Sequence, residues 1–143
     1  PLTLMSLVYR LWGAVRIDEI MNWQLSWIPD ALKGFRKNAG TGDIYMELAL
    51  RIEHAILSGE PLMSASFDFR KCFDLIPHNI LFEVLERTGL HERLLRPLRH
   101  MYSHLERRWK LGRHGVGSVW RASNGILQGC GLSVVLLNCL VAL

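Results

Sequence analysis

The feature that most constrains the fold is a short apolar run that ends in an acidic residue. Leu62 to Phe67 is built from apolar and small residues, and Gly59 and Pro61 bound it upstream. A run of this length is too short for an independent helix and predicts a buried strand. Because side chains alternate faces along a strand, Asp68 is expected to project from the strand end. A carboxylate is costly to bury unless it is paired, protonated or bound to a cation, so Asp68 is either a turn cap or a functional group.

Composition sets the class of protein. The chain has 143 residues, half of them apolar, which suits a single core. Three cysteines without a Cys-x-x-Cys pair argue against a disulfide framework and a zinc site, and fit an intracellular protein, nuclear or cytoplasmic. His100 and His104 have metal-ligand spacing but no evident third ligand, so surface histidines are expected.

The two ends of the chain suggest a fragment of a longer protein. The sequence opens at Pro1 without an initiator methionine and stops inside the apolar run 132–143. That run is shorter than the roughly 20 apolar residues that span a bilayer. It is therefore expected to form a buried helix, with no membrane association.

Positive charge gathers in the second part of the chain. The net charge is +4, and residues 93–121 hold eight Lys or Arg against Glu106 alone. Arginine outnumbers lysine 13 to 4, which favours bidentate phosphate contacts. Such a block is either a solvated helix face or a surface that binds a polyanion.

Hydrophobic spacing predicts a chain rich in helices. Pro97 would cost about 3 kcal/mol inside a helix, so a break is expected at Leu95–Arg96. Trp23 and Trp27 lie one helical turn apart and are expected to pack in the core, with base stacking as the alternative. Helices are predicted within 1–15, 17–27, 44–58, 77–88 and 94–105, and a hairpin over 109–111 and 116–121. The helix over 44–58 is expected to pack on the sheet that carries Asp68.

A glycine-rich basic loop covers 34–43. Three glycines in nine residues let backbone N–H groups approach a ligand closely, and Arg36 and Lys37 add positive charge. The loop therefore suits a phosphate, although the Walker lysine-serine/threonine ending is missing. An ordinary helix entry with Asp43 as N-cap is the alternative, and both can hold together.

The segment after the apolar run has a recognisable pattern. Asp68-Phe69-Arg70-Lys71-Cys72-Phe73-Asp74, followed by Ile76-Pro77-His78, resembles the first catalytic motif of reverse transcriptases. The resemblance is closest to non-long-terminal-repeat (LINE-like) retrotransposon enzymes and more distant to group II intron enzymes. Three further segments match in order: 1–10 resembles the first fingers block, 34–43 the second, and 122–133 the palm motif glycine-x-x-glutamine-glycine-x-proline-leucine-serine-proline. Gly131 and Val134 replace the two prolines of that motif.

The resemblance implies a role for individual residues. Asp68 would be catalytic and would hold Mg2+ together with the backbone carbonyl of Phe69. Phe73 would be the aromatic gate that collides with a 2′-hydroxyl, with core packing as the alternative, and Asp74 a structural acceptor. The implied nucleotide-binding residues are Arg10, Arg36, Lys37, Phe73, Gln128 and Gly129. For Arg10 the alternative is a solvent-facing arginine on an amphipathic helix. The basic block predicts nucleic-acid contacts by Arg96, Arg99, Arg107 and Arg108.

The resemblance also implies an architecture and a limit. The expected fold is α+β: part of a right-hand polymerase, with helices packed on a small antiparallel sheet, fingers at 1–60 and the first half of the palm at 61–143. The partners would be an RNA template, a DNA primer and deoxynucleoside triphosphates. No aspartate follows Asp74, so the Asp-Asp pair that completes a two-Mg2+ site is missing, and residues 1–143 alone are expected not to polymerise. The alternatives are an RNA- or DNA-binding remnant of a decayed retroelement and a helical interaction domain without a nucleic-acid role.

Overall fold

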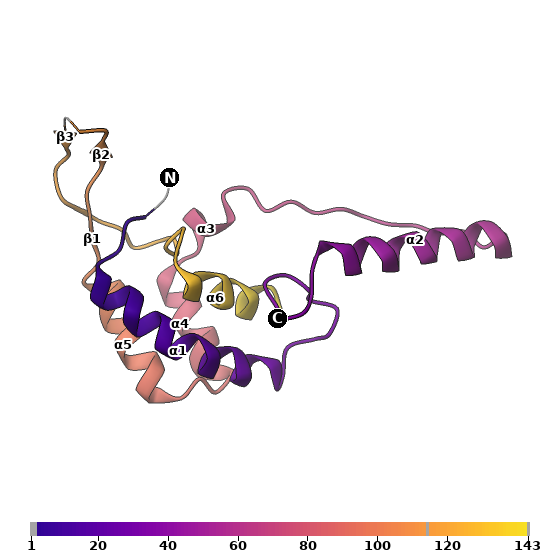
Figure 1. Cartoon of the computed structure of the whole chain (residues 1–143), viewed down its shortest axis with the longest axis horizontal. Coiled ribbons are helices and arrows are strands. Elements are labelled where there is room, and N and C mark those ends of the chain that lie inside the picture. Colours follow the sequence, from indigo (N-terminus) through magenta and orange to yellow (C-terminus); the bar gives the residue numbers. More distant parts are fainter. Residues whose placement is uncertain (1–2, 114, 143) are drawn as a thin grey trace.

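The computed structural model describes residues 3–113 and 115–142, and within them it has an α+β fold (Figure 1). Helices dominate, and in the described ranges the strands are four two-residue segments that pair into two antiparallel ladders. The elements are α1 Leu7–Leu25, α2 Thr41–Ser58, α3 Cys72–Leu75, α4 His78–Arg87, α5 Glu92–Ser103, β1 Glu106–Arg107, β2 Lys110–Leu111, β3 Gly115–Val116, β4 Trp120–Arg121 and α6 Gly131–Val141.

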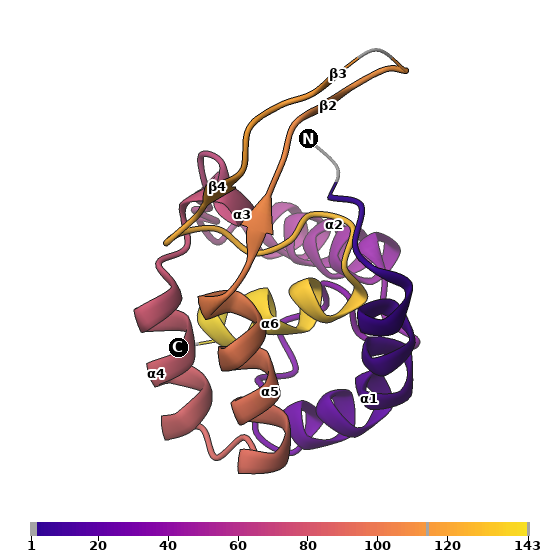
Figure 2. The same ribbon diagram turned by 90° about the vertical axis from the view of Figure 1, so that its left-hand side faces the viewer.

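The core lies where four helices meet. The apolar helix α6 packs against both α1 and α4, and α5 packs on α4. Figure 2 shows α1 on one side of α6 and α4 and α5 on the other. Burying one large aliphatic side chain contributes about 1.5–3 kcal/mol, so this cluster supplies much of the stability. Its most buried members include Ile20, Leu81, Leu85, Leu98, Tyr102, Leu132 and Leu136.

Helix α1 is one continuous helix where the sequence predicted two segments. Ser6 caps it by accepting a hydrogen bond from the Tyr9 backbone N–H. Its buried face carries Gln24, whose Nε2 donates to the Val135 carbonyl over 2.7 Å and to Cys139 Sγ over 3.1 Å. Trp23 and Trp27 contact each other edge to face, and both pack against the core, as expected.

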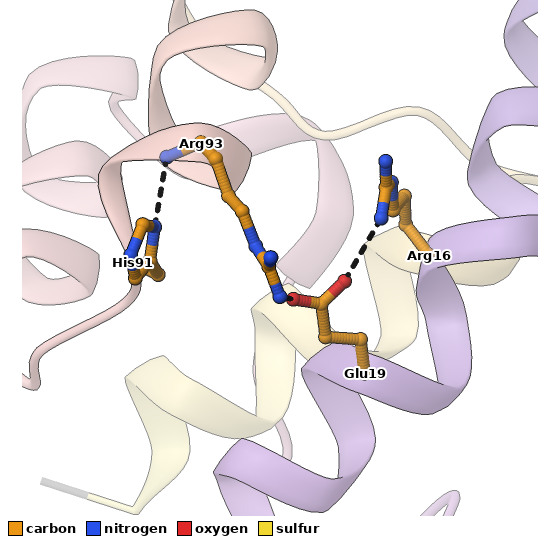
Figure 3. A network of polar contacts seen from close by, with 4 residues as sticks. All are labelled: Arg16, Glu19, His91 and Arg93. Atoms are coloured by element: carbon orange, nitrogen blue, oxygen red, sulfur yellow. Dashed lines mark hydrogen bonds and ion pairs between the residues drawn. The ribbon is translucent and has the colours of Figure 1, made fainter.

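A network of ion pairs connects α1 to the start of α5 (Figure 3). The Glu19 carboxylate accepts a hydrogen bond from Arg16 over 3.2 Å and a second one from the Arg93 guanidinium. His91 is the N-cap of α5 and accepts from the Arg93 backbone N–H over 3.1 Å. The hydrogen bond from Arg93 lowers the pKa of the Glu19 carboxyl.

The predicted hairpin is confirmed. Lys110 pairs with Val116 and Leu111 with Gly115, while Arg107 pairs with Trp120 nearer the body. The hairpin projects away from the helices in both views (Figures 1 and 2). His114, at the predicted turn, lies outside the described residues.

The predicted buried strand over 62–67 is wrong. Residues 60–69 are extended but belong to neither ladder, and Met63 and Phe67 are 94% and 86% exposed. A strand needs a partner for its backbone groups and a surface for its apolar face. The described residues supply neither, so the apolar sequence stays in solvent.

The expected packing of α2 is also wrong. The helix has the predicted bounds to within three residues and ends at Gly59 with φ +70°. None of its residues is buried, and it lies away from the four-helix core in Figure 1. Asp43 is not the N-cap but sits three positions inside, where its carboxylate accepts from the Gly40 N–H over 2.7 Å.

The break predicted at Leu95–Arg96 does not occur, because α5 runs through Pro97 without interruption. Pro97 is the sixth of the twelve residues of the helix, and its missing N–H forfeits the backbone bond to the Arg93 carbonyl. Leu94, Leu95 and Leu98 are fully buried, and their packing offsets that loss.

The overall expectation of an α+β chain with a small antiparallel sheet is confirmed. The helices, however, pack mainly on one another, whereas the paired strands stand outside the core. Within the described residues, no helix combines the length and apolarity needed to cross a membrane.

Candidate functional site

The turn that carries Gln128 is docked on the segment that follows Asp68. The Ile126 N–H donates to the Phe73 carbonyl over 2.8 Å, and the Gly125 N–H donates to Ile76 over 2.7 Å. The Gln128 side chain completes the contact: its Nε2 donates to Asp74 Oδ1 over 3.1 Å. The motif around Asp74 and the motif around Gln128, about fifty residues apart in the sequence, are thus held against each other.

Gly125 makes this close approach feasible. Its φ is +87°, and a Cβ built on it would lie only 2.9 Å from the Asp74 carbonyl oxygen. A side chain would therefore be strained by conformation and would also strike backbone. The Gly125 carbonyl oxygen can only accept, so the His78 Nε2 at 2.9 Å carries the hydrogen, and Arg107 donates to the same oxygen over 3.2 Å.

The N-terminal residues reach the same turn. The Thr3 N–H donates to the Gln128 carbonyl over 2.9 Å, and the Tyr9 hydroxyl lies 3.4 Å from Cys130 Sγ. Burial, together with the neighbouring thiol, raises the pKa of Tyr9 far above its usual value. Arg10 follows Tyr9 on α1 and is exposed.

Asp68 and Phe69 lie in the exposed segment that leads into α3. Partial burial raises the pKa of the Cys72 thiol, and the negative charge of Asp68 raises it further. Phe73 is half-buried and packs against the core, so its packing role is present. Gly129 directly follows Gln128 and has φ +94°.

The glycine-rich loop docks elsewhere on α6. The Asn138 side chain donates to the Gly34 carbonyl over 2.8 Å, roughly 12 Å along the helix from its N-terminal end. The Arg36 guanidinium forms an ion pair with Asp30 at 3.2 Å and donates a hydrogen bond to the Pro29 carbonyl over 3.1 Å. Lys37 is exposed. The loop therefore contacts α6 at a different place from the Gln128 turn, which lies just before the N-terminus of that helix.

The four predicted nucleic-acid-binding arginines occupy different environments. Arg96 and Arg108 are exposed, and within 3–113 and 115–142 neither forms an ion pair. Arg99 pairs with Glu86 over 2.8 Å and borders an open depression of about 330 Å3 between α4 and α5. Arg107 is half-buried and lies 5.5 Å from the Trp120 ring centroid. Sequence reasoning missed that Arg107 and His78 converge on Gly125, since nothing in the sequence relates these three positions.

The metal-binding groups on the described part of the chain do not complete a two-ion site. Asp68 is one carboxylate with the Phe69 carbonyl beside it, and Asp74 is bonded to Gln128. No cluster of three or more His, Cys, Asp or Glu side chains is found in that part of the chain. Mg2+ takes a few carboxylates in octahedral geometry, so further ligands would have to come from elsewhere.

Comparison with known proteins places the chain in a family. A search of curated proteins and a search of solved structures found no match. The family model described as "Reverse transcriptase (RNA-dependent DNA polymerase)" matches residues 1–142, which is nearly the whole chain. The turn that joins Gln128 to Asp74 therefore lies inside the matched region, and the chain belongs to the reverse transcriptase (RNA-dependent DNA polymerase) family.

Proposed function

We propose that residues 1–143 form the fingers and the first half of the palm of a LINE-like, non-LTR reverse transcriptase that adds deoxynucleotides to a primer on an RNA template. The observation that carries the proposal is the family match over residues 1–142. The docking of Gln128 on Asp74 supports it, because a nucleotide site needs elements distant in sequence to be held together.

Each side chain then has a defined task. Asp68, with the Phe69 carbonyl, supplies one part of a divalent-ion site, and enzymes of this family generally use divalent metal ions. Mg2+ is the ion we propose. Such ions would neutralise charge on the triphosphate, but Asp68 alone cannot hold two of them, so the missing carboxylates would follow in the complete domain. Arg10 is assigned to the triphosphate because it is exposed on α1 and directly follows Tyr9, whose hydroxyl lies 3.4 Å from Cys130 Sγ.

The remaining residues select the nucleotide. Gln128 and Gly129 line the base and sugar, and the ring of Phe73 excludes a 2′-hydroxyl. Arg36 and Lys37 serve the triphosphate only if their loop moves toward Asp68, because Arg36 is tied to Asp30 in this structure. An exposed α2 and an exposed 60–69 segment leave room for such a movement.

Primer extension by the complete polypeptide tests the proposal. Asp68→Asn should abolish incorporation while template binding persists, and Asp18→Asn, an exposed aspartate on α1, is the matched control. Full incorporation by Asp68→Asn would refute the catalytic assignment. Phe73→Val should raise ribonucleotide incorporation relative to deoxynucleotide incorporation.

The single usable carboxylate also favours a second candidate, a non-catalytic RNA- or DNA-binding remnant. In that case binding would depend on salt and would survive Asp68→Asn, but no polypeptide containing this chain would extend a primer. Incorporation that Asp68→Asn abolishes would eliminate this candidate.

A further inference from the structure

The hairpin over 106–121 is the most basic part of the chain. It holds five Lys or Arg against Glu106, a balance of +4, which equals the net charge of all 143 residues. Glu106 is already paired with Arg121 at 2.9 Å. Arg108, Lys110 and Arg113 are exposed, and no ion pair involves them in the part of the chain that the structure describes. Three cations without a protein partner on one projecting element favour a polyanion.

The same hairpin carries an exposed aromatic stack. The rings of Trp109 and Trp120 are stacked with centroids 6.2 Å apart and planes 21° from parallel. The Arg107 guanidinium lies against Trp120, which is 37% exposed, whereas Trp109 is 56% exposed. Across the hairpin, Gly117 donates its N–H to the Trp109 carbonyl over 2.8 Å, and a Cβ there would sit 3.5 Å from the Trp109 Cβ.

The stack is connected to the Gln128 turn. Arg107 touches Trp120 and also donates to the Gly125 carbonyl, three residues before Gln128. Gly125 in turn packs on the Asp74 backbone. The aromatic stack and the turn that carries Gln128 are therefore linked through one side chain, that of Arg107.

We propose that this hairpin binds the unpaired RNA template, with a base stacked on Trp109 and the backbone phosphates held by Arg108, Lys110 and Arg113. Stacking on tryptophan combined with a basic groove is the general means of holding single strands, because every base offers a π face. Trp109 and the cations beside it in sequence face opposite sides of the ribbon. The ribbon is only two strands wide, roughly 5 Å between strands, so long basic side chains reach around its edge. The choice of RNA rests on the proposed function.

The test is binding of a fluorescein-labelled 12-residue oligoadenylate RNA to the 143-residue chain, followed by anisotropy without nucleotide or metal. Trp109→Leu keeps an apolar side chain but removes the π face, and should weaken binding about tenfold. Trp109→Phe retains a ring and should stay within about threefold of the original chain. Circular dichroism and the thermal midpoint verify that each variant is folded.

A second variant separates stacking from charge. Arg108→Gln combined with Lys110→Gln should reduce the slope of log affinity against log salt by about 1.4, whereas Trp109→Leu should leave the slope unchanged. A blunt RNA duplex of the same length has no free base, so its binding should not respond to Trp109→Leu.

Several results would overturn the assignment: no binding by the original chain at low salt, equal affinity of Trp109→Leu and the original chain, or equal losses in Trp109→Leu and Trp109→Phe. Tighter binding of the deoxyadenylate oligomer would overturn the choice of RNA. None of these results involves incorporation, so failure here is distinguishable from failure of the Asp68→Asn test.

Discussion

Gln128 donates a hydrogen bond through Nε2 to Asp74 Oδ1 over 3.1 Å, and this contact joins the two motifs of the candidate site. Both groups are at least partly exposed, so water competes for the bond. The bond therefore contributes more to geometry than to stability. The backbone contacts of Gly125 and Ile126 beside it supply most of the docking.

The Asp74–Gln128 bond should be measurable as a coupling. In a double-mutant cycle of Asp74→Ala and Gln128→Ala, we expect a coupling of about 0.5 kcal/mol in urea denaturation, the low end of the range for one net hydrogen bond, because water competes for this one. The pair Asp74→Ala and Glu53→Ala, with Glu53 exposed on α2, should be additive. Additivity at Asp74 and Gln128 as well would show that the contact is not made in solution.

Replacement of Gly125 should be the most damaging small change at the site. Gly125→Ala combines a left-handed φ with a contact of 2.9 Å to backbone, and should lower the free energy of unfolding by about 2–5 kcal/mol. Gly89 also has a positive φ, but the space around it is open. Gly89→Ala therefore isolates the conformational contribution to the loss of stability. Gly115→Ala has neither feature. Equal effects of Gly125→Ala and Gly89→Ala would contradict the steric explanation.

The charge of Asp68 should be detectable through Cys72. Burial raises the pKa of the Cys72 thiol first, and the carboxylate adds to the rise. A raised thiol pKa means less thiolate at a given pH, so Asp68→Asn should lower that pKa and speed alkylation of Cys72 by iodoacetamide near pH 8. Mass spectrometry separates Cys72 from the buried Cys130 and Cys139.

If Asp68→Asn leaves the alkylation rate of Cys72 unchanged, Asp68 lies too far from the start of α3 to form one site with Phe73 and Gln128. Asp43→Asn, in the first turn of α2, provides the matched loss of one aspartate charge and should leave the rate unchanged.

The ion network between α1 and α5 should make stability depend on pH. The hydrogen bond from Arg93 lowers the pKa of Glu19 in the folded protein. A lowered folded pKa gives stability above the unfolded pKa, and this is lost as pH falls through the folded pKa. The thermal midpoint should therefore drop less on acidification in Glu19→Gln than in the original chain. The control Glu53→Gln, at an exposed position of α2, should show the same drop in thermal midpoint on acidification as the original chain.

Local sequence was sufficient to predict most helices and the hairpin. The α2 bounds, the Gly59 end and the pairing over 109–121 follow from periodicity, glycine positions and turn composition, which act within a few residues. The motif around Asp68 and the one around Gln128 likewise predicted the family that the profile match shows. The roles of the individual site residues stay predictions.

The sequence by itself determined most of the helical segments, the family and the segregation of positive charge, because these depend on residue type and spacing. Only the tertiary structure decided whether an apolar segment is buried, since burial needs a partner surface. Residues 62–67 and α2 have none among the described residues, whereas Pro97 is held inside a helix by the packing of its neighbours. The meeting of Gly125 with Asp74, His78 and Arg107 was likewise decided by long-range packing, which no local pattern encodes.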